Sequence, residues 1–415
     1  MKIRRLLNLR RFVPALAGGI FVLSTIWFVP ALTADPHPDR VDHIFFIMME
    51  NHATSEIIGN TADAPFINQL AHRYAVATNY HGVTHPSLPN YLAAISGDFQ
   101  GIWDDCKAGP AVTVLTCDPS APMSELSFVP GAGDATDPGF PPYHDPHSPL
   151  FGLVPPQLTA AEITSAENVP HWFAGQTLVD QLENQGMTWK AYMQSLPVVG
   201  SDVEYWPVVG GATYKLYAQK HNPFMYFSRI RNVPSRVNNI VPLPELDYDL
   251  TTNTPNFVWI SPDQCNDMHG VSPSSAAALG FPQCGYPSSG LDHGAIQLGD
   301  SFLQATVGKI MNSPAWSKNS ILVIVWDEDD YNGYPSGCCG SPAGQAGTLG
   351  PILGGAVAPA IIIRSNEPAH RQSNHAYNHY SLLGTIQRIW NLGCLANTCG
   401  FNDSNLMFDL FGNPE

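Results

Sequence analysis

Two nearly continuous apolar runs of the chain each end abruptly in charged or polar residues. His43–Met49 is followed by Glu50 and Asn51, and Ser320–Trp326 is followed by four carboxylates at positions 327–330. Apolar runs of this length predict strands that are buried on both faces of a parallel sheet. Ligands of open α/β sheets bind beyond the carboxyl ends of the strands. We therefore expect the acidic residues that follow the two runs to meet in one site.

A third strand is predicted at 257–260, and helical patterns separate the strands. The helical patterns cover 64–74, 90–95, 177–185, 299–310 and 380–392. Strands that alternate with helices predict a layered α/β fold. The segment 107–170 is rich in Pro, Gly, Ser and Asp and has no sustained period, so we interpret it as a loop-rich insertion. We expect a single domain over residues 35–415.

The first 34 residues have the layout of an export signal. Basic residues precede an apolar stretch that runs from Phe12 to Leu32, and no acidic residue occurs in this segment. A cleavage site of small residues ends near Ala34, although an apolar stretch this long can also stay as an uncleaved membrane anchor. We favour cleavage, which leaves no membrane span and predicts an exported protein that is secreted, periplasmic or on the cell surface.

The composition excludes two broad classes of protein. The 415 residues include 35 Asp and Glu against 19 Lys and Arg, a net charge of −16, which excludes nucleic-acid binding through a basic surface. Hydrophobic residues make up 44% of the chain, enough to build a large core and to exclude disorder over most of its length. The sequence contains no glycine-rich P-loop, so it gives no support for ATP-dependent chemistry. Oligomeric state has no readable sequence signature.

Eight cysteines, an even number, predict disulfides in an exported chain. Nearness in sequence favours the pairs Cys106–Cys117, Cys265–Cys284 and Cys394–Cys399. The adjacent Cys338 and Cys339 could bond to each other or to separate partners. Thiolate ligation of a metal is the weaker interpretation because the chain has no Cys-x-x-Cys pair.

Hydroxyl and imidazole groups cluster just before the helical pattern at 90–95. Among them, Ser87 stands two positions before Pro89, and proline suits the first turn of a helix. Backbone N–H groups and the helix dipole stabilise negative charge at this end of a helix, which suits a nucleophile that must bind a phosphoryl group. The alternative is that Ser87 simply caps the helix.

Oxygen ligands suited to a divalent cation follow the two predicted strands, and the set consists of Glu50, Asn51, Asp327 and Glu328. The metal could be Mg²⁺, Ca²⁺, Mn²⁺ or Zn²⁺. A cation here would lower the pKa of the Ser87 hydroxyl and neutralise charge on phosphoryl oxygens. Because four consecutive carboxylates cannot all reach one ion, we interpret Asp329 and Asp330 as a solvated acidic turn.

Fifteen histidines are many for this length, and three stand in or near the other motifs: His85, His269 and His379. Neutral histidine suits metals and protonated histidine suits phosphate, but each could instead be a hydrogen-bonded structural side chain in the core or on the surface. We prefer the structural alternative for His144, His147 and His370. Lys220 and His221 could bind phosphate or cap a turn.

Four motifs occur in an order that resembles a known family. They are Met49-Glu50-Asn51-His52, the His-Pro-Ser-Leu-Pro-Asn-Tyr stretch at 85–91, Trp326-Asp327-Glu328-Asp329 and the His-Tyr-Ser-Leu-Leu stretch at 379–383. Together they resemble the phosphoesterase family of bacterial phospholipases C and secreted acid phosphatases, in the alkaline-phosphatase-like superfamily. The resemblance covers essentially the whole chain after the leader. It implies a three-layer α/β sandwich with a mixed, mostly parallel central sheet, long ordered loops and a metal-assisted phosphoenzyme mechanism.

The resemblance also implies roles for individual residues. Ser87 would be the nucleophile, with Thr84 as the alternative. The ligands of the metal would be Glu50, Asn51, Asp327 and Glu328, and Asp267 would complete a second metal site. The residues that bind phosphate oxygens or protonate the leaving group would be Asn90, His85, His269 and His379.

Two departures from the phospholipase C pattern favour phosphomonoesters as substrates. His-Ala-Thr-Ser follows Glu50-Asn51 where that branch has Arg-Ser-Phe-Asp, and the motif at 85–91 looks more like the acid phosphatase branch. We therefore expect an exported, metal-dependent acid phosphatase that acts through a phosphoserine, with a phosphodiesterase or phospholipase C as the alternative. A binding protein that has lost catalysis is disfavoured because Ser87, Glu50 and Asp327 are intact.

Overall fold

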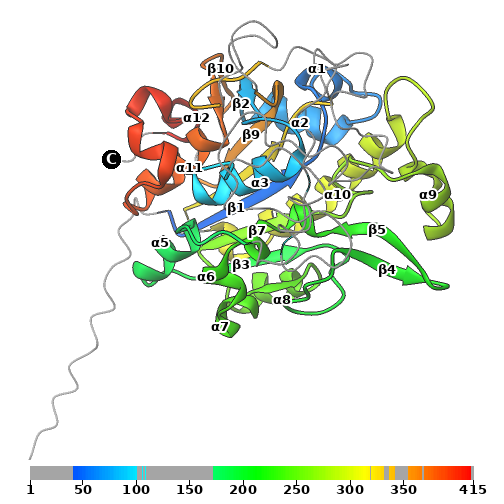
Figure 1. Cartoon of the computed structure of the whole chain (residues 1–415). Coiled ribbons are helices and arrows are strands. Elements are labelled where there is room, and N and C mark those ends of the chain that lie inside the picture. The colour runs from blue at the N-terminus through cyan, green and yellow to red at the C-terminus, as the bar shows by residue number, and fades with distance from the viewer. Residues whose placement is uncertain are drawn as a thin grey trace, which may run out of the picture. The chain divides into compact units, whose positions relative to one another are not determined.

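The computed structural model describes residues 41–100, 105, 108, 172–317, 319–330, 336–341, 354–366 and 369–412 (Figure 1). Contacts divide the chain into two units, residues 1–38 and 39–415, and only the second contains described residues. The following predicted features lie outside the described residues: the leader at 1–34, nearly all of the insertion at 107–170, the pair Cys106–Cys117, His144 and His147. The extent of the domain stays a prediction.

Within the described residues, the central sheet has nine strands. In spatial order they are β10 (Arg371–Ser373), β2 (Ala75–His81), β9 (Val357–Arg364), β8 (Ser320–Trp326), β1 (His43–Met49), β7 (Phe257–Ser261), β3 (Trp189–Met193) and β6 (Ile240–Pro242), and β11 (Tyr377–Asn378) also pairs with β2. β9 is antiparallel to both of its neighbours, and the other described pairings are parallel. The expected mixed, mostly parallel sheet is confirmed.

β1 lies in the middle of this sheet, between β7 and β8. Its last residue, Met49, is in register with Trp326, the last residue of β8. The N–H group of Asp327 donates to the carbonyl oxygen of Met49 at 3.0 Å. On the other side of β1, Ile47 is in register with Ile260 of β7. All three strands therefore end at one edge of the sheet, as their sequence pattern predicted.

Helices cover both faces of the sheet and make three layers. One face packs against α3 (Ser87–Ser96), α5 (Leu178–Asn184) and α11 (His379–Ile389), and the other packs against α2 (Pro65–Arg73), α8 (Glu245–Thr252) and α10 (His293–Met311). Adjacent residues of β1 alternate between the two cores, with Phe46 in the first and Phe45 in the second. Burial on both faces explains why the strand is a continuous apolar run.

A hairpin beside the main sheet was not predicted from the sequence. Its strands, β4 (Tyr205–Val209) and β5 (Ala212–Ala218), form a separate two-stranded sheet, which Figure 1 shows extending away from β3 and β7. It leads into a 3₁₀ turn at Gln219–His221. The remaining helices are α1 (Thr54–Ile57), α6 (Ser228–Arg231), α7 (Pro234–Val237), α9 (Pro273–Leu279) and α12 (Phe408–Phe411), with 3₁₀ turns at Pro223–Tyr226, Pro282–Cys284, Pro314–Ser317, Ala396–Gly400 and Asp403–Asn405.

The predicted helices are present, and two of them begin earlier than expected. α3 begins at Ser87 instead of 90, and α10 begins at His293 instead of 299. The earlier start of α10 is explained by Asp292, whose side chain accepts the N–H group of Ala295 at 3.1 Å and caps the helix.

Three disulfides lie in the described parts of the chain. The predicted pairs Cys265–Cys284 and Cys394–Cys399 are confirmed, and Cys338 is bonded to its neighbour Cys339. None of the helices in the described ranges has both the length and the hydropathy that a membrane span requires.

Candidate active site

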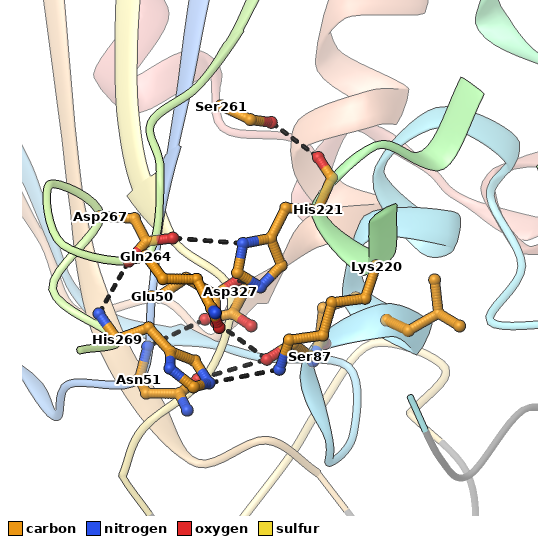
Figure 2. Close-up of polar contacts among 12 residues, drawn as sticks. Glu50, Asn51, Ser87, Lys220, His221, Ser261, Gln264, Asp267, His269 and Asp327 are labelled. Carbon is orange, nitrogen blue, oxygen red and sulfur yellow. Dashed lines mark hydrogen bonds and ion pairs between the residues drawn. The ribbon is translucent and has the colours of Figure 1, made fainter. Parts of the chain in front are cut away.

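Four carboxylates from three strand ends converge at the edge of the sheet. They are Glu50 after β1, Asp267 in the segment after β7, and Asp327 and Glu328 after β8, and all four are fully buried. The β1 and β8 ends are tied together by the N–H group of Asn51, which donates to Asp327 Oδ1 at 3.1 Å. Figure 2 shows Glu50, Asp267 and Asp327 gathered near the side chain of His221. The structure thus brings together the predicted metal-ligand set and Asp267.

Ser87 points into this cluster from the first turn of α3. Its Oγ donates to Glu50 Oε2 at 2.8 Å and lies 3.4 Å from Asn51 Oδ1 and 3.5 Å from Glu328 Oε1 (Figure 2). The side chain is 1% exposed. The N-cap position of α3 belongs to Pro86 and has no side-chain cap bond, so the alternative that Ser87 caps the helix is wrong.

Asn90 braces the turn that precedes Ser87. Its Oδ1 accepts the N–H groups of Val83 at 2.7 Å and Thr84 at 3.3 Å, and its Nδ2 donates to the carbonyl oxygens of Thr84 at 2.7 Å and Pro86 at 3.1 Å. The side chain is fully buried. The same Nδ2 also lies 3.4 Å from Glu328 Oε2, so Asn90 links this turn to the carboxylate cluster. These contacts make Asn90 a brace of the turn that carries Ser87, and its contact with phosphate stays a prediction.

The carboxylates are held close together in a dry environment, and this changes their acidity. Burial, and after it the neighbouring carboxylates, raise the pKa of Glu50, Asp267 and Asp327 well above their ordinary values. Burial also raises the pKa of Glu328 to about 7, although nearby His85 acts in the opposite direction. The buried carboxylates therefore have too little positive charge near them to keep their ordinary pKa values.

His221 lies between two of these carboxylates. Its Nε2 is 3.1 Å from Glu50 Oε1, its Nδ1 is 3.2 Å from Asp267 Oδ2, and its ring stacks on Tyr91 with 5.1 Å between centroids. Burial, and then nearby Lys220, lower its pKa well below the ordinary value, so the ring is neutral and has only one N–H to donate. One ring nitrogen therefore turns a lone pair toward a carboxylate oxygen, a contact that is stable only with a proton or a cation between the atoms.

Several buried polar atoms of the cluster have no hydrogen-bond partner among the described residues. They are Glu50 Oε1, Asp267 Oδ2, Asp327 Oδ2 and His221 Nε2. Buried polar groups normally have partners, and buried charges are normally paired or bind metals. Carboxylate oxygens with one imidazole nitrogen fit a divalent cation such as Zn²⁺ or Mn²⁺. Within the ranges that the structure describes, no three His, Cys, Asp or Glu side chains are arranged as a ready metal site, so the fit is one of ligand chemistry.

Lys220 brings a buried positive charge to the cluster. The side chain is 5% exposed, and its Nζ lies 2.8 Å from Asp105 Oδ2. The same Nζ lies 3.2 Å from His269 Nε2 (Figure 2). Because an ammonium group can only donate, His269 Nε2 accepts and its proton is on Nδ1, which lies 3.0 Å from the carbonyl oxygen of Gly270. The N–H group of His269 donates to Asp267 Oδ1 at 2.8 Å. Lys220 and His269 thus form a proton-carrying pair next to the carboxylates.

His85 is held between acidic side chains at the same edge. Its Nδ1 is 2.5 Å from Glu328 Oε2, and its Nε2 is 3.3 Å from Asp329 Oδ1. Burial lowers the pKa of His85, but the two carboxylates outweigh burial and raise it to about 10. The expectation that Asp329 belongs to a solvated turn is wrong, because its side chain is 3% exposed and faces His85. Asp330 is partly exposed.

His379 lies behind the cluster. Its Nδ1 accepts from the Tyr80 hydroxyl at 2.8 Å, and its Nε2 donates to the backbone oxygen of Asp327 at 2.6 Å. Burial lowers its pKa to about 4, so the ring is neutral. With both nitrogens engaged by the protein, His379 is arranged to position Asp327, in contrast to the predicted contact with substrate. His370, expected to be structural, is on the surface.

Three residues near the site were given no role there from the sequence: Asp105, Tyr80 and Asp329. Asp105 lies beside the irregular segment 107–170, where no pattern marks single positions. Tyr80 belongs to β2, which was not predicted. For Asp329, the only signal in the sequence was its place in the Trp-Asp-Glu-Asp motif.

The sequence profile of the phosphoesterase family matches residues 60–280 and 286–393. The chain therefore belongs to the phosphoesterase family, and it is a phosphoric ester hydrolase. It is 26% identical over 352 residues to a phosphatidylinositol-3-phosphatase of Mycobacterium tuberculosis, a match that covers 84% of this chain and 77% of that protein.

More distant relatives are fungal. The chain is 20% identical to a probable acid phosphatase of Kluyveromyces lactis over 91% of this chain, and it spans 65% of that protein's length. It is also 20% identical to an acid phosphatase of Aspergillus fumigatus over 80% of this chain, and it spans 52% of that protein. Among solved structures, a Vibrio parahaemolyticus protein of the alkaline phosphatase superfamily matches 87% of this chain and 68% of its own, with 12% identity and a TM-score of 0.45.

Proposed function

We propose that the protein is an exported, metal-dependent phosphatase that hydrolyses phosphomonoesters through a phosphoserine at Ser87. The observation that carries the proposal is the 2.8 Å hydrogen bond from Ser87 Oγ to Glu50 Oε2 at the N-terminus of α3. A nucleophile needs a group that accepts its proton and donors that stabilise the developing charge. Glu50 is suited to the first requirement, and the first turn of α3 is suited to the second.

The residues proposed to hold the cation are Glu50, Asp267, Asp327 and His221, with Asn51 and Glu328 at the side of Ser87. The assignment is supported by unpartnered buried atoms of Glu50, Asp267, Asp327 and His221. When bound, the cation would supply positive charge that lowers the pKa of the serine hydroxyl and neutralises phosphoryl oxygens. His221 is added to the predicted ligands, and one or two ions are compatible with this set.

In the first chemical step, Ser87 Oγ gives its proton toward Glu50 Oε2 and attacks phosphorus. The Oγ–P bond forms while the ester P–O bond breaks, and the leaving alcohol takes up a proton. Of the three predicted histidines, His379 has both nitrogens bonded to protein and His85 holds its protons against carboxylates. We therefore propose Lys220 with His269 as the proton source. In the second step, water gives its proton to the same pair and its oxygen attacks phosphorus. The Oγ–P bond breaks, Ser87 Oγ takes back the proton from Glu50, and phosphate leaves.

Monoesters are the preferred substrate class. The mycobacterial relative and the fungal relatives are named as phosphatases, and the motif at 85–91 has the acid phosphatase form. The alternative, a phosphodiesterase or phospholipase C, uses the same site chemistry. Export is supported by the predicted leader and by the three disulfides, which are typical of oxidising compartments.

The test compares hydrolysis of p-nitrophenyl phosphate, its bis ester and phosphatidylcholine, with and without chelator, in wild type and Ser87→Ala. The matched control is Ser301→Ala, an exposed serine whose hydroxyl donates to the carbonyl oxygen of Gln297 in its own helix. We expect monoester turnover that falls by about 10³-fold or more in Ser87→Ala and stays unchanged in the control. Preferred diester turnover would favour the alternative, and full activity of Ser87→Ala would exclude this nucleophile.

A further inference from the structure

Asp105 makes two contacts that a phosphoryl group bound at this site would need. Its Oδ1 accepts the backbone N–H group of Leu88 at 3.0 Å, and its Oδ2 accepts from Lys220 Nζ at 2.8 Å. The Asp105 side chain is 10% exposed, and the Lys220 side chain is 5% exposed. A carboxylate therefore bridges a helix N-terminal donor and a buried ammonium group.

Both donors are suited to bind the oxygens of a phosphate that Ser87 attacks. Leu88 directly follows Ser87, so its N–H group belongs to the first turn of α3, whose donors have no partner within the helix. These donors, together with the helix dipole, form an anion-binding site. A phosphorus atom attacked by Ser87 Oγ would carry its non-bridging oxygens toward the Leu88 N–H group. Lys220 adds the positive charge on the side of His269.

We propose that the Asp105 carboxylate occupies the phosphoryl-oxygen position in the free protein and that the substrate displaces it from Leu88 and Lys220. This inference rests on the proposed function, because it takes Ser87 as the point of attack. Its effect is twofold. Competition by an internal anion weakens the binding of phosphate, so the product leaves readily. It also selects substrates, because a monoester dianion competes for Lys220 better than the single charge of a diester does.

An alternative role for Asp105 is to position Lys220, and the two roles predict opposite results. If Asp105 competes with phosphate, its neutralisation frees the two donors and tightens phosphate binding. If Asp105 positions Lys220, its neutralisation leaves the ammonium group misplaced and weakens phosphate binding. The inference is therefore testable by a binding measurement that needs no turnover.

The experiment measures the Kd of inorganic phosphate by titration calorimetry for wild type, Asp105→Asn and Asp247→Asn. The control removes one carboxylate that is 56% exposed and pairs with Lys309 outside the site. We expect phosphate to bind about tenfold more tightly to Asp105→Asn, because the Leu88 N–H group and Lys220 no longer donate to a competing charged group. The control should bind phosphate as wild type does. Unchanged or weaker binding would overturn the inference.

Turnover of p-nitrophenyl phosphate by wild type separates this inference from the proposed function. Absence of turnover would contradict the function, whereas turnover without tighter phosphate binding in Asp105→Asn would contradict only the role of Asp105. If Asp105→Asn does not fold, a crystal structure of wild type with bound phosphate tests whether phosphate displaces the Asp105 carboxylate. The inference predicts that the ion contacts the Leu88 N–H group and that the Asp105 carboxylate has left it. An Asp105 carboxylate that keeps both contacts beside bound phosphate would overturn the inference.

Discussion

His221 Nε2 lies 3.1 Å from Glu50 Oε1, and neither atom has a hydrogen-bond partner within the described residues. Both side chains are almost completely buried. Burial of a carboxylate oxygen without a hydrogen-bond partner is costly, and burial raises the pKa of Glu50 well above its ordinary value. A cation shared by the two atoms would remove the conflict. This relationship makes His221, which the sequence pointed to only as a phosphate-binding candidate, a proposed metal ligand.

His221→Ala is predicted to weaken cation binding by about tenfold or more, because a direct ligand contributes at least as much as the outer partners of a metal site. The measurement is calorimetric titration of the metal-free protein with Mn²⁺ or Zn²⁺, and the control is His370→Ala on the surface. Equal affinity of wild type and His221→Ala for both ions would exclude His221 as a ligand.

Asn90→Ala is predicted to reduce the free energy of unfolding by about 1–3 kcal/mol, because the buried N–H groups of Val83 and Thr84 lose their acceptor. Turnover should fall with it, since the turn that carries Ser87 loosens. Urea unfolding measures the first effect. Asn184→Ala, at an exposed position of α5, is the control. A variant with native stability and only a raised KM would instead identify Asn90 as a phosphate-binding residue.

His379 predicts a pH dependence of stability. Burial lowers its pKa to about 4, against about 6.5 in an unfolded chain, so the unfolded state binds more protons between these values. Stability contributed by the neutral ring is therefore present above pH 6.5 and is lost as the pH falls toward 4, by about 3 kcal/mol. The free energies of unfolding of wild type and His379→Gln should therefore approach each other as the pH falls toward 4. Parallel pH profiles of the two proteins would contradict a buried neutral ring.

The edge of the sheet that carries the site could be predicted because three strands are apolar on both faces. That pattern located the ends of β1, β8 and β7, and parallel pairing then fixed that Glu50 and Asp327 would meet. Ser87 could be located because a helix begins there. The motifs also indicated His85 and His269, which do lie at the site.

The positions that sequence reasoning missed depend on tertiary contacts. Asp329 was expected in a solvated turn because four consecutive carboxylates cannot all reach one ion, yet a protonated His85 offsets its charge. Asp105 reaches Lys220 from a region without periodicity, so only the folded chain reveals the contact. His379 was expected at the substrate because it lies in a motif, but β2 brings Tyr80 to its ring and engages it.

The most direct test of the account is to trap the covalent intermediate. Wild type is mixed with p-nitrophenyl phosphate, quenched in acid within milliseconds to seconds, and digested for peptide mass spectrometry. The account predicts one phosphate on the peptide that contains Ser87, located at that residue by fragmentation, and none in Ser87→Ala. Phosphate on Thr84, or steady turnover by wild type without any phosphopeptide, would contradict a phosphoserine at Ser87.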